Sequence, residues 1–180
     1  ECSAVMLPIT GITARFLSCT FNRPKDRGIS SAGTGCQGMF VDMCQFLSNE
    51  QGLPAQDRTT IALNVQANDV KLRNNRIVRF AHFAILNGTG HLIHANHFFQ
   101  GDDEPAGIRR AGLVFTQTNV STVVTGNYID NCFIEWGNEH DSAPEESGEF
   151  SFGGLNIVGN VFIASSTSSA FRWVVVKPYG

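Results

Sequence analysis

The sequence lacks the features that mark several common classes of protein. No apolar run approaches the roughly 18 residues of a membrane-spanning helix, so we expect no membrane insertion. Residues 1–10 contain no basic region followed by a hydrophobic stretch and a cleavage site, so no signal segment is expected there. Positive charge is also scarce. The 13 Lys and Arg against 16 Asp and Glu give a formal net charge of −3, and nucleic acid is therefore not expected as a partner.

Short catalytic and metal-binding motifs are absent as well. No GxSxG, HExxH, P-loop or GxGxxG pattern in a βαβ context occurs, so the sequence does not predict nucleophilic, zinc-protease or nucleotide chemistry. The five Cys form no CxxC pair and no zinc-ligand spacing, and we favour reduced core cysteines over a disulfide. His91, His94 and His97 lie close in sequence but do not converge on the expected strands. We expect no metal and no cofactor.

What the sequence does contain is a repeat. Fourteen Phe, 18 Gly and many Asn and Thr, with little that indicates an amphipathic helix, predict an all-β chain. Six segments share one pattern: an apolar residue, two variable residues, Cys or Asn, one variable residue, and a second apolar residue. These segments are 16–21, 41–46, 72–77, 93–98, 124–129 and 157–162. Their fourth positions are Cys19, Cys44, Asn75, Asn96, Asn127 and Asn160, at intervals of 25, 31, 21, 31 and 33 residues.

Intervals of this size predict a solenoid or a β-propeller. A propeller blade needs four strands, and the 21-residue interval from Asn75 to Asn96 is too short to hold them. We therefore predict a right-handed parallel β-helix of about six rungs. Equivalent residues of successive rungs then lie about 4.8 Å apart, so the two apolar positions form inward columns and the Asn side chains form a hydrogen-bonded ladder at a turn.

A second strand is expected in each rung, so that a rung has at least two strands plus turns. These strands are predicted at 61–65, 83–86, 113–116, 133–136 and 171–175, with 28–31 as a poorer first copy. The first and last rungs of a solenoid expose unpaired backbone, and neither end of the sequence offers an obvious cap. We expect residues 1–180 to form a single β-helix domain that is a segment of a longer protein or associates with other copies.

Uneven rung lengths place two long loops at one corner of the expected coil. About 18 residues separate the Cys or Asn position from the second strand in rung two and about 17 in rung four, but only about 8 in rung three. The result is a trough whose walls are the loops 48–59 and 101–110, with Arg76, Arg79 and His82 near its floor.

The walls of this trough are polar. They carry both carboxylates and guanidinium groups, which suit the hydroxyl and carboxyl groups of sugars, although ordinary solvated surface loops have the same composition. The candidate ligand-binding residues of the trough are Asp57, Arg58, Arg79, His82, Glu104 and Arg109.

A further insertion, at 137–152, follows the second strand of rung five. It is rich in acidic residues and comes directly after Glu135 and Trp136, so it forms either part of a sugar-binding site or a flexible acidic loop. Glycoside hydrolysis uses two carboxyl groups about 5 to 9.5 Å apart, a distance that the sequence does not give. The candidate catalytic carboxylates are Asp102, Asp103, Glu135 and Asp141.

The repeated Ile-x-x-Asn-x-Phe segments at 93–98 and 157–162 resemble those of the pectate-lyase-like superfamily of right-handed β-helices. Segments 85–100, 113–119 and 125–136 are similar to the shaft or receptor-binding region of phage and phage-like tail fibres and tailspikes. A pectate lyase would need an aspartate cluster for Ca²⁺ and a catalytic Arg on its strands, and no such cluster stands at matching positions.

This resemblance covers roughly residues 12–176. It implies a homotrimer on a virion tail or in the extracellular space, with other tail or virion proteins as partners. Such a protein recognises host cell-surface polysaccharide, and some members of the family also cleave it. Three functions therefore remain open: a receptor-binding protein that binds a glycan, a polysaccharide depolymerase of the glycoside hydrolase or lyase type, and a structural spacer within a fibre.

Overall fold

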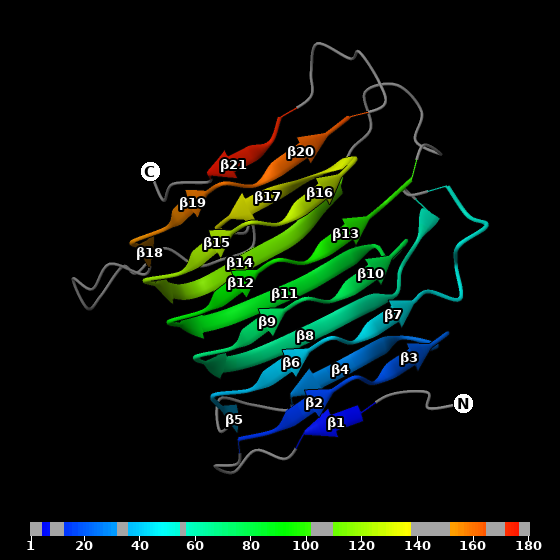
Figure 1. Ribbon diagram of the computed structural model, residues 1–180, viewed down its shortest axis with the longest axis horizontal. Coiled ribbons are helices and arrows are strands. Elements are labelled where there is room, and N and C mark those ends of the chain that lie inside the picture. The colour runs from blue at the N-terminus through cyan, green and yellow to red at the C-terminus, as the bar shows by residue number, and fades with distance from the viewer. Residues whose placement is uncertain are drawn as a thin grey trace.

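A computed structural model of the chain describes residues 5–7, 13–31, 36–54, 57–101, 110–137, 152–164 and 172–176. The regular elements in these ranges are β-strands, and all the strand pairings found there are parallel. Over the same ranges no helix has the length and apolar character needed to cross a membrane. The predicted all-β parallel β-helix of about six rungs is confirmed (Figure 1).

Three sheets run along the coil. Sheet A contains β1 (Val5–Leu7), β4 (Arg27–Ser31), β8 (Ile61–Asn68), β11 (His82–Thr89), β14 (Arg110–Val120), β17 (Cys132–Trp136) and β21 (Val174–Val176). Sheet B contains β2 (Arg15–Leu17), β6 (Phe40–Asp42), β9 (Lys71–Arg73), β12 (Leu92–His94), β15 (Val123–Thr125) and β19 (Asn156–Val158). Sheet C contains β3 (Thr20–Asn22), β7 (Gln45–Leu47), β10 (Arg76–Val78), β13 (His97–Phe99), β16 (Tyr128–Asp130) and β20 (Val161–Ile163). Two further short strands, β5 (Cys36–Gln37) and β18 (Phe152–Gly153), pair with β8 and β14.

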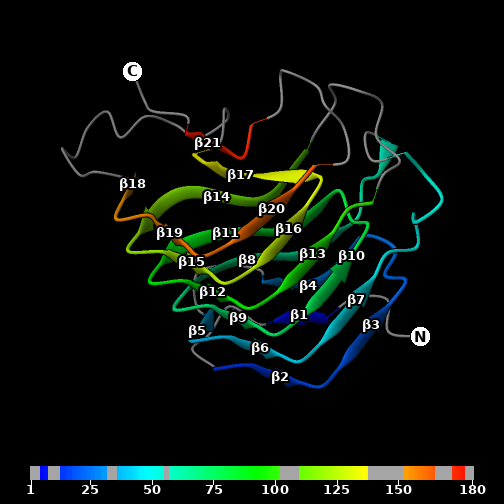
Figure 2. The same cartoon turned by 45° about the horizontal axis from the view of Figure 1, so that its top comes forward.

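Each rung passes through sheets B, C and A in that order, so a rung has three strands. The repeat unit predicted from the sequence spans a strand of sheet B, a corner, and a strand of sheet C (Figure 2). At this corner one residue adopts the left-handed conformation, which turns the chain within two residues. The corner residues are Ser18, Met43, Asn74, Ala95, Gly126 and Gly159, with φ between 53° and 67°. Strand β1, which pairs with β4 ahead of the first repeat, was not predicted.

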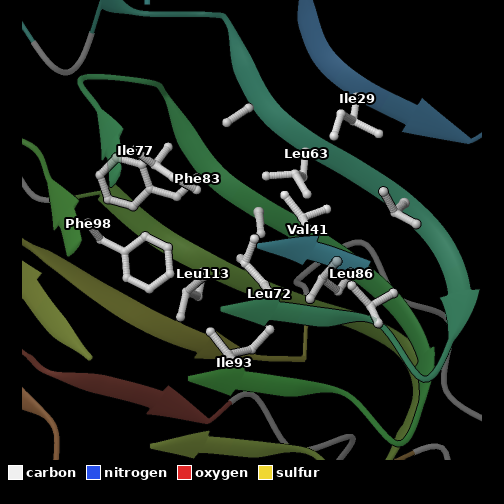
Figure 3. Packing of buried hydrophobic residues seen from close by; sticks show 14 of the residues in the cluster. Ile29, Val41, Leu63, Leu72, Ile77, Phe83, Leu86, Ile93, Phe98 and Leu113 are labelled. Atoms are coloured by element: carbon white, nitrogen blue, oxygen red, sulfur yellow. The ribbon is translucent and has the colours of Figure 1, made fainter. Parts of the chain in front are cut away.

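The two predicted apolar columns are in register and fill the interior. The column of sheet C runs from Phe21 to Phe162, and that of sheet B from Phe16 to Ile157. In the middle rungs these side chains are fully buried, and Figure 3 shows how they meet sheet A residues such as Leu63 across the core. Burial of each Val, Leu, Ile or Phe contributes about 1.5 to 3 kcal/mol, so stacked apolar rungs supply most of the stability.

An asparagine ladder links the rungs at the corner between sheets B and C, as predicted. The Oδ1 atom of each Asn accepts from the backbone N–H of the equivalent residue in the preceding rung, at 2.8 to 3.0 Å. Its Nδ2 donates to a backbone carbonyl of that rung, at 2.8 to 2.9 Å. Cys19 and Cys44 occupy the same positions in the first two rungs, and these two residues, like Cys36 and Cys132, form no disulfide. The ladder satisfies buried polar groups that a tight corner would otherwise leave unpaired.

Candidate functional site

The two long insertions leave the coil at the same corner. One begins after β7 and the other after β13, and both strands pair with β10, which lies between them. Rung three turns from β10 into β11 within residues 79–81. The predicted placement of both insertions at one corner is therefore confirmed, while residues 102–109 of the second lie outside the described residues.

Glu50 cross-links the first of these loops, which follows β7. The carboxylate accepts hydrogen bonds from the backbone N–H and hydroxyl groups of both Thr59 and Thr60, at 2.7 to 2.9 Å. Partial burial raises the pKa of Glu50, but these hydrogen bonds outweigh that effect and hold the pKa below its usual range. This carboxylate is occupied within its own loop.

Two arginines fasten the loop over rung three. Arg58 is only 1% exposed, and it donates from Nε to the Leu53 carbonyl at 3.0 Å and from a terminal nitrogen to the Gln100 carbonyl at 3.2 Å. Arg79 donates to the carbonyl of Gln51 at 2.7 Å. Arg58 thus reaches from rung two past rung three to the end of β13, and the two side chains bridge the floor of the predicted trough.

The remaining trough residues differ in their placement. Asp57 is exposed, whereas His82 is half-buried with its Nδ1 2.7 Å from the carbonyl oxygen of Ala111. The candidates Asp102, Asp103, Glu104 and Arg109, and also Asp141 of the rung-five insertion, lie outside the described residues. Within the described ranges, no three His, Cys, Asp or Glu side chains gather as potential ligands of a metal ion.

Glu135 and Trp136 occupy opposite faces of β17. Trp136 is 6% exposed, and its ring packs inside the coil against Phe115 at a centroid distance of 5.3 Å. Glu135 is half-buried on the outer face, in register with Val114 and Val175. Since neighbouring residues of a strand point to opposite faces, this acid and this ring do not share a surface.

A second polar surface comes from the outward residues of sheets B and C, which we call the front face. In Figure 1 the strands of the two sheets lie end to end toward the viewer, with sheet A behind them. Three positions of each rung point outward here: the first and third residues of the sheet B strand and the first residue of the sheet C strand. In rung three these positions are Lys71, Arg73 and Arg76.

The cations of rung three are arranged around an aromatic ring. Phe40, in register with Lys71, lies with its ring centroid 4.5 Å from the guanidinium carbon of Arg73 and 5.9 Å from the Nζ of Lys71. Arg73 also pairs with Asp42 at 2.7 Å, and Asn74 donates to the same carboxylate at 2.9 Å. The hydrogen bond from Arg73, followed by that from Asn74, lowers the pKa of Asp42.

Aromatic rings continue this surface on sheet C. The outward column of first residues runs through Gln45, Arg76, His97 and Tyr128, which are in register in four successive rungs. The rings of His97 and Tyr128 meet edge to face at 4.6 Å. Partial burial and then the charge of Arg76 lower the pKa of His97, so this imidazole is held neutral near pH 7.

The sequence contained a signal for this surface that the loop-based prediction missed. The variable positions of the repeat had to point outward once the apolar and Asn positions pointed inward. Two of them, Arg73 and Arg76, are cationic in rung three, and Lys71 stands immediately before the repeat unit. Comparison with known proteins found no matching family model, no matching curated protein and no matching solved structure.

Proposed function

We propose that this chain binds a cell-surface polysaccharide through its front face, as part of a phage or phage-like tail fibre or tailspike. The observation that carries the binding proposal is the in-register column of Gln45, Arg76, His97 and Tyr128 on sheet C. A polysaccharide repeats its chemical groups along its length, and a β-helix repeats its side-chain positions about every 4.8 Å. A column of rings and hydrogen-bonding groups at this spacing therefore provides contacts for successive sugars.

The residue types in this column suit sugars. A sugar ring has apolar C–H faces and a rim of hydroxyl groups, so it needs a flat apolar partner together with donors and acceptors. Tyr128 is 36% exposed and supplies such a ring beside that of His97. Gln45 and Arg76 are exposed and supply an amide and a guanidinium group.

The place in a tail fibre is proposed from the resemblance of the repeat segments to that family. This part of the proposal includes a homotrimeric assembly, an extracellular or virion location and contacts with other tail proteins. Light scattering on the purified chain gives its mass in solution, and a monomer at high concentration would count against this part of the proposal. The binding proposal does not depend on it.

Glycan binding is tested by replacing Tyr128 with Ser. We expect retention of purified host surface polysaccharide to weaken about tenfold, or 1.4 kcal/mol, because the ring lies centrally on the proposed surface. The matched control is Trp173→Ala, which removes a ring of similar exposure, 38%, from rung six. Equal binding by wild type and Y128S would refute the role of the column.

The same incubation separates binding from cleavage. Retention of the polysaccharide at unchanged length supports a receptor-binding protein. Release of shorter oligosaccharides instead supports the depolymerase, and the carboxylates to replace first are then Asp102, Asp103, Glu135 and Asp141. If the polysaccharide is neither retained nor cleaved, the remaining candidate function is a structural spacer within a fibre.

A further inference from the structure

We infer that the ligand of the front face is an acidic polysaccharide, whose carboxylate or sulfate groups bind the cations of rung three. This inference rests on the proposed function and adds to it a ligand class and a location. It is carried by the placement of Lys71, Arg73 and Arg76 in one rung, on the same outward surface as the column of sheet C.

The cations of rung three are spaced along the direction of the strand. Lys71 and Arg73 are two residues apart on one strand, so their positions differ by about 6.6 Å. Arg76 follows on the other side of the corner, after Asn74 and Asn75. Rung three thus offers three positive groups in a line across the front face. A chain that crosses the rungs would instead meet Arg76 and then the rings of His97 and Tyr128.

Arg73 is paired with a carboxylate, which leaves Lys71 and Arg76 as the uncompensated cations of rung three among the described residues. Among the described outward residues of sheets B and C, the carboxylates are Asp42 and Asp130. Asp42 is engaged with Arg73 and Asn74, and Asp130 is buried and accepts from the backbone N–H of Gly101 at 3.0 Å. Across the part of the chain that the structure describes, neither Lys71 nor Arg76 forms an ion pair. The formal net charge of −3 therefore conceals a locally positive surface.

Phe40 restricts the positions of two of the cations before a ligand binds. Its ring centroid lies 4.5 Å from the guanidinium carbon of Arg73 and 5.9 Å from the Nζ of Lys71, and Asp42 pairs with Arg73 at 2.7 Å. Such contacts restrict long side chains before the ligand arrives, which lowers the entropy lost on binding. Guanidinium groups also bind carboxylates and sulfates through paired hydrogen bonds, whereas a neutral glycan would not need three cations.

The test compares the full chain with a charge-removing double variant, Lys71→Gln with Arg76→Gln. Arg73 is left in place because it holds Asp42. The probes are alginate, which carries carboxylates, dextran sulfate, uncharged dextran, and poly-glutamate as a polyanion that is not a glycan. Binding is measured by calorimetry or interferometry at about 0.05 M and about 0.5 M salt.

We expect the double variant to bind alginate or dextran sulfate at least about tenfold more weakly at low salt. The matched control, Lys25→Gln with Arg172→Gln, removes the same charge from exposed positions away from rung three and should stay within about twofold of wild type. The charge-keeping variant Lys71→Arg with Arg76→Lys should retain binding. High salt should weaken alginate binding by the wild type more than alginate binding by the double variant.

Each contrary result has its own meaning. If a neutral glycan is bound and Y128S weakens that binding, while the double variant does not, the proposed function stands and the acidic-ligand inference is overturned. If poly-glutamate binds as tightly as alginate, the surface is a general polyanion site, and the inference is overturned as well. If the chain retains no polysaccharide, acidic or neutral, the proposed function itself fails.

Discussion

Replacing Asn96 by Ala removes the centre of the asparagine ladder. Its Oδ1 accepts from the backbone N–H and the side-chain amide of Asn75, at 3.0 and 2.9 Å. Its Nδ2 donates to the Leu72 carbonyl at 2.8 Å and to the Oδ1 of Asn127 at 3.0 Å. In the variant the Asn75 amide still donates to Val41, and the Asn127 oxygen still accepts from the backbone of residue 96.

The loss in free energy of unfolding follows from these partners. The backbone N–H of Asn75 loses its side-chain acceptor in a buried position, which costs about 1 to 3 kcal/mol, and the other lost bonds add roughly 0.5 kcal/mol each. The sum is about 3 kcal/mol. Asn160 lies in the last rung and is only half-buried, so its replacement by Ala should cost about 1 kcal/mol.

Urea unfolding followed by far-UV circular dichroism measures both effects through the transition midpoint and slope. The control is Asn64→Ala, the same chemical change at a half-buried outward position of β8, for which we expect a change within about 0.5 kcal/mol. If N96A unfolds within about 1 kcal/mol of the wild type, the ladder does not stabilise the coil as argued, and the apolar columns alone account for its stability.

Three further changes test other parts of the coil. Burial lowers the pKa of His91 from 6.5 to about 4, so the unfolded chain binds a proton before the folded one does, and stability should fall by up to about 3 kcal/mol as pH drops through that window. His91→Phe should flatten this dependence in urea titrations, and an unchanged slope would contradict it. Arg58→Met leaves two carbonyl groups without their donor, so limited proteolysis should cut the loop 48–60 faster than in the wild type. Gly88→Ala should lower the melting temperature by several degrees, because φ is +122° and a Cβ would overlap the backbone of Ala67; an unchanged melting temperature would refute this.

The interior of the coil was predictable because stacking forces the same residue type into equivalent positions. The ladder places Asn at the same position of rungs three to six, with Cys in the first two rungs, and the columns need apolar side chains. Both therefore produce a periodic pattern in the sequence. The corner between sheets B and C leaves none, since residues as different as Met43, Ala95 and Gly126 adopt the left-handed conformation there. For that reason the two short strands of each repeat unit resembled a single segment before the structure separated them.

The loop residues were less predictable because their roles depend on distant partners. The sequence predicts Arg58 to be a ligand-binding residue on a polar loop. In the structure its guanidinium group donates to the carbonyl of Gln100, which is 42 residues away in sequence. The orientation of Trp136 did leave a signal, since Ile134 and Trp136 alternate with Glu135 along one strand. Applying that two-residue period would have placed the ring inside the coil.

The charges of rung three are not required by the fold, which strengthens their assignment to a ligand. The ladder and the apolar columns use only inward side chains, so the outward positions of sheets B and C are free to vary. Ion pairs near the surface contribute about 0 to 1 kcal/mol, and Arg73 forms such a pair with the largely buried Asp42. Lys71 and Arg76 add like charges nearby, which is mildly unfavourable for folding. A double variant that removes both should therefore fold as well as the wild type, so that any loss of alginate binding reports the contact itself.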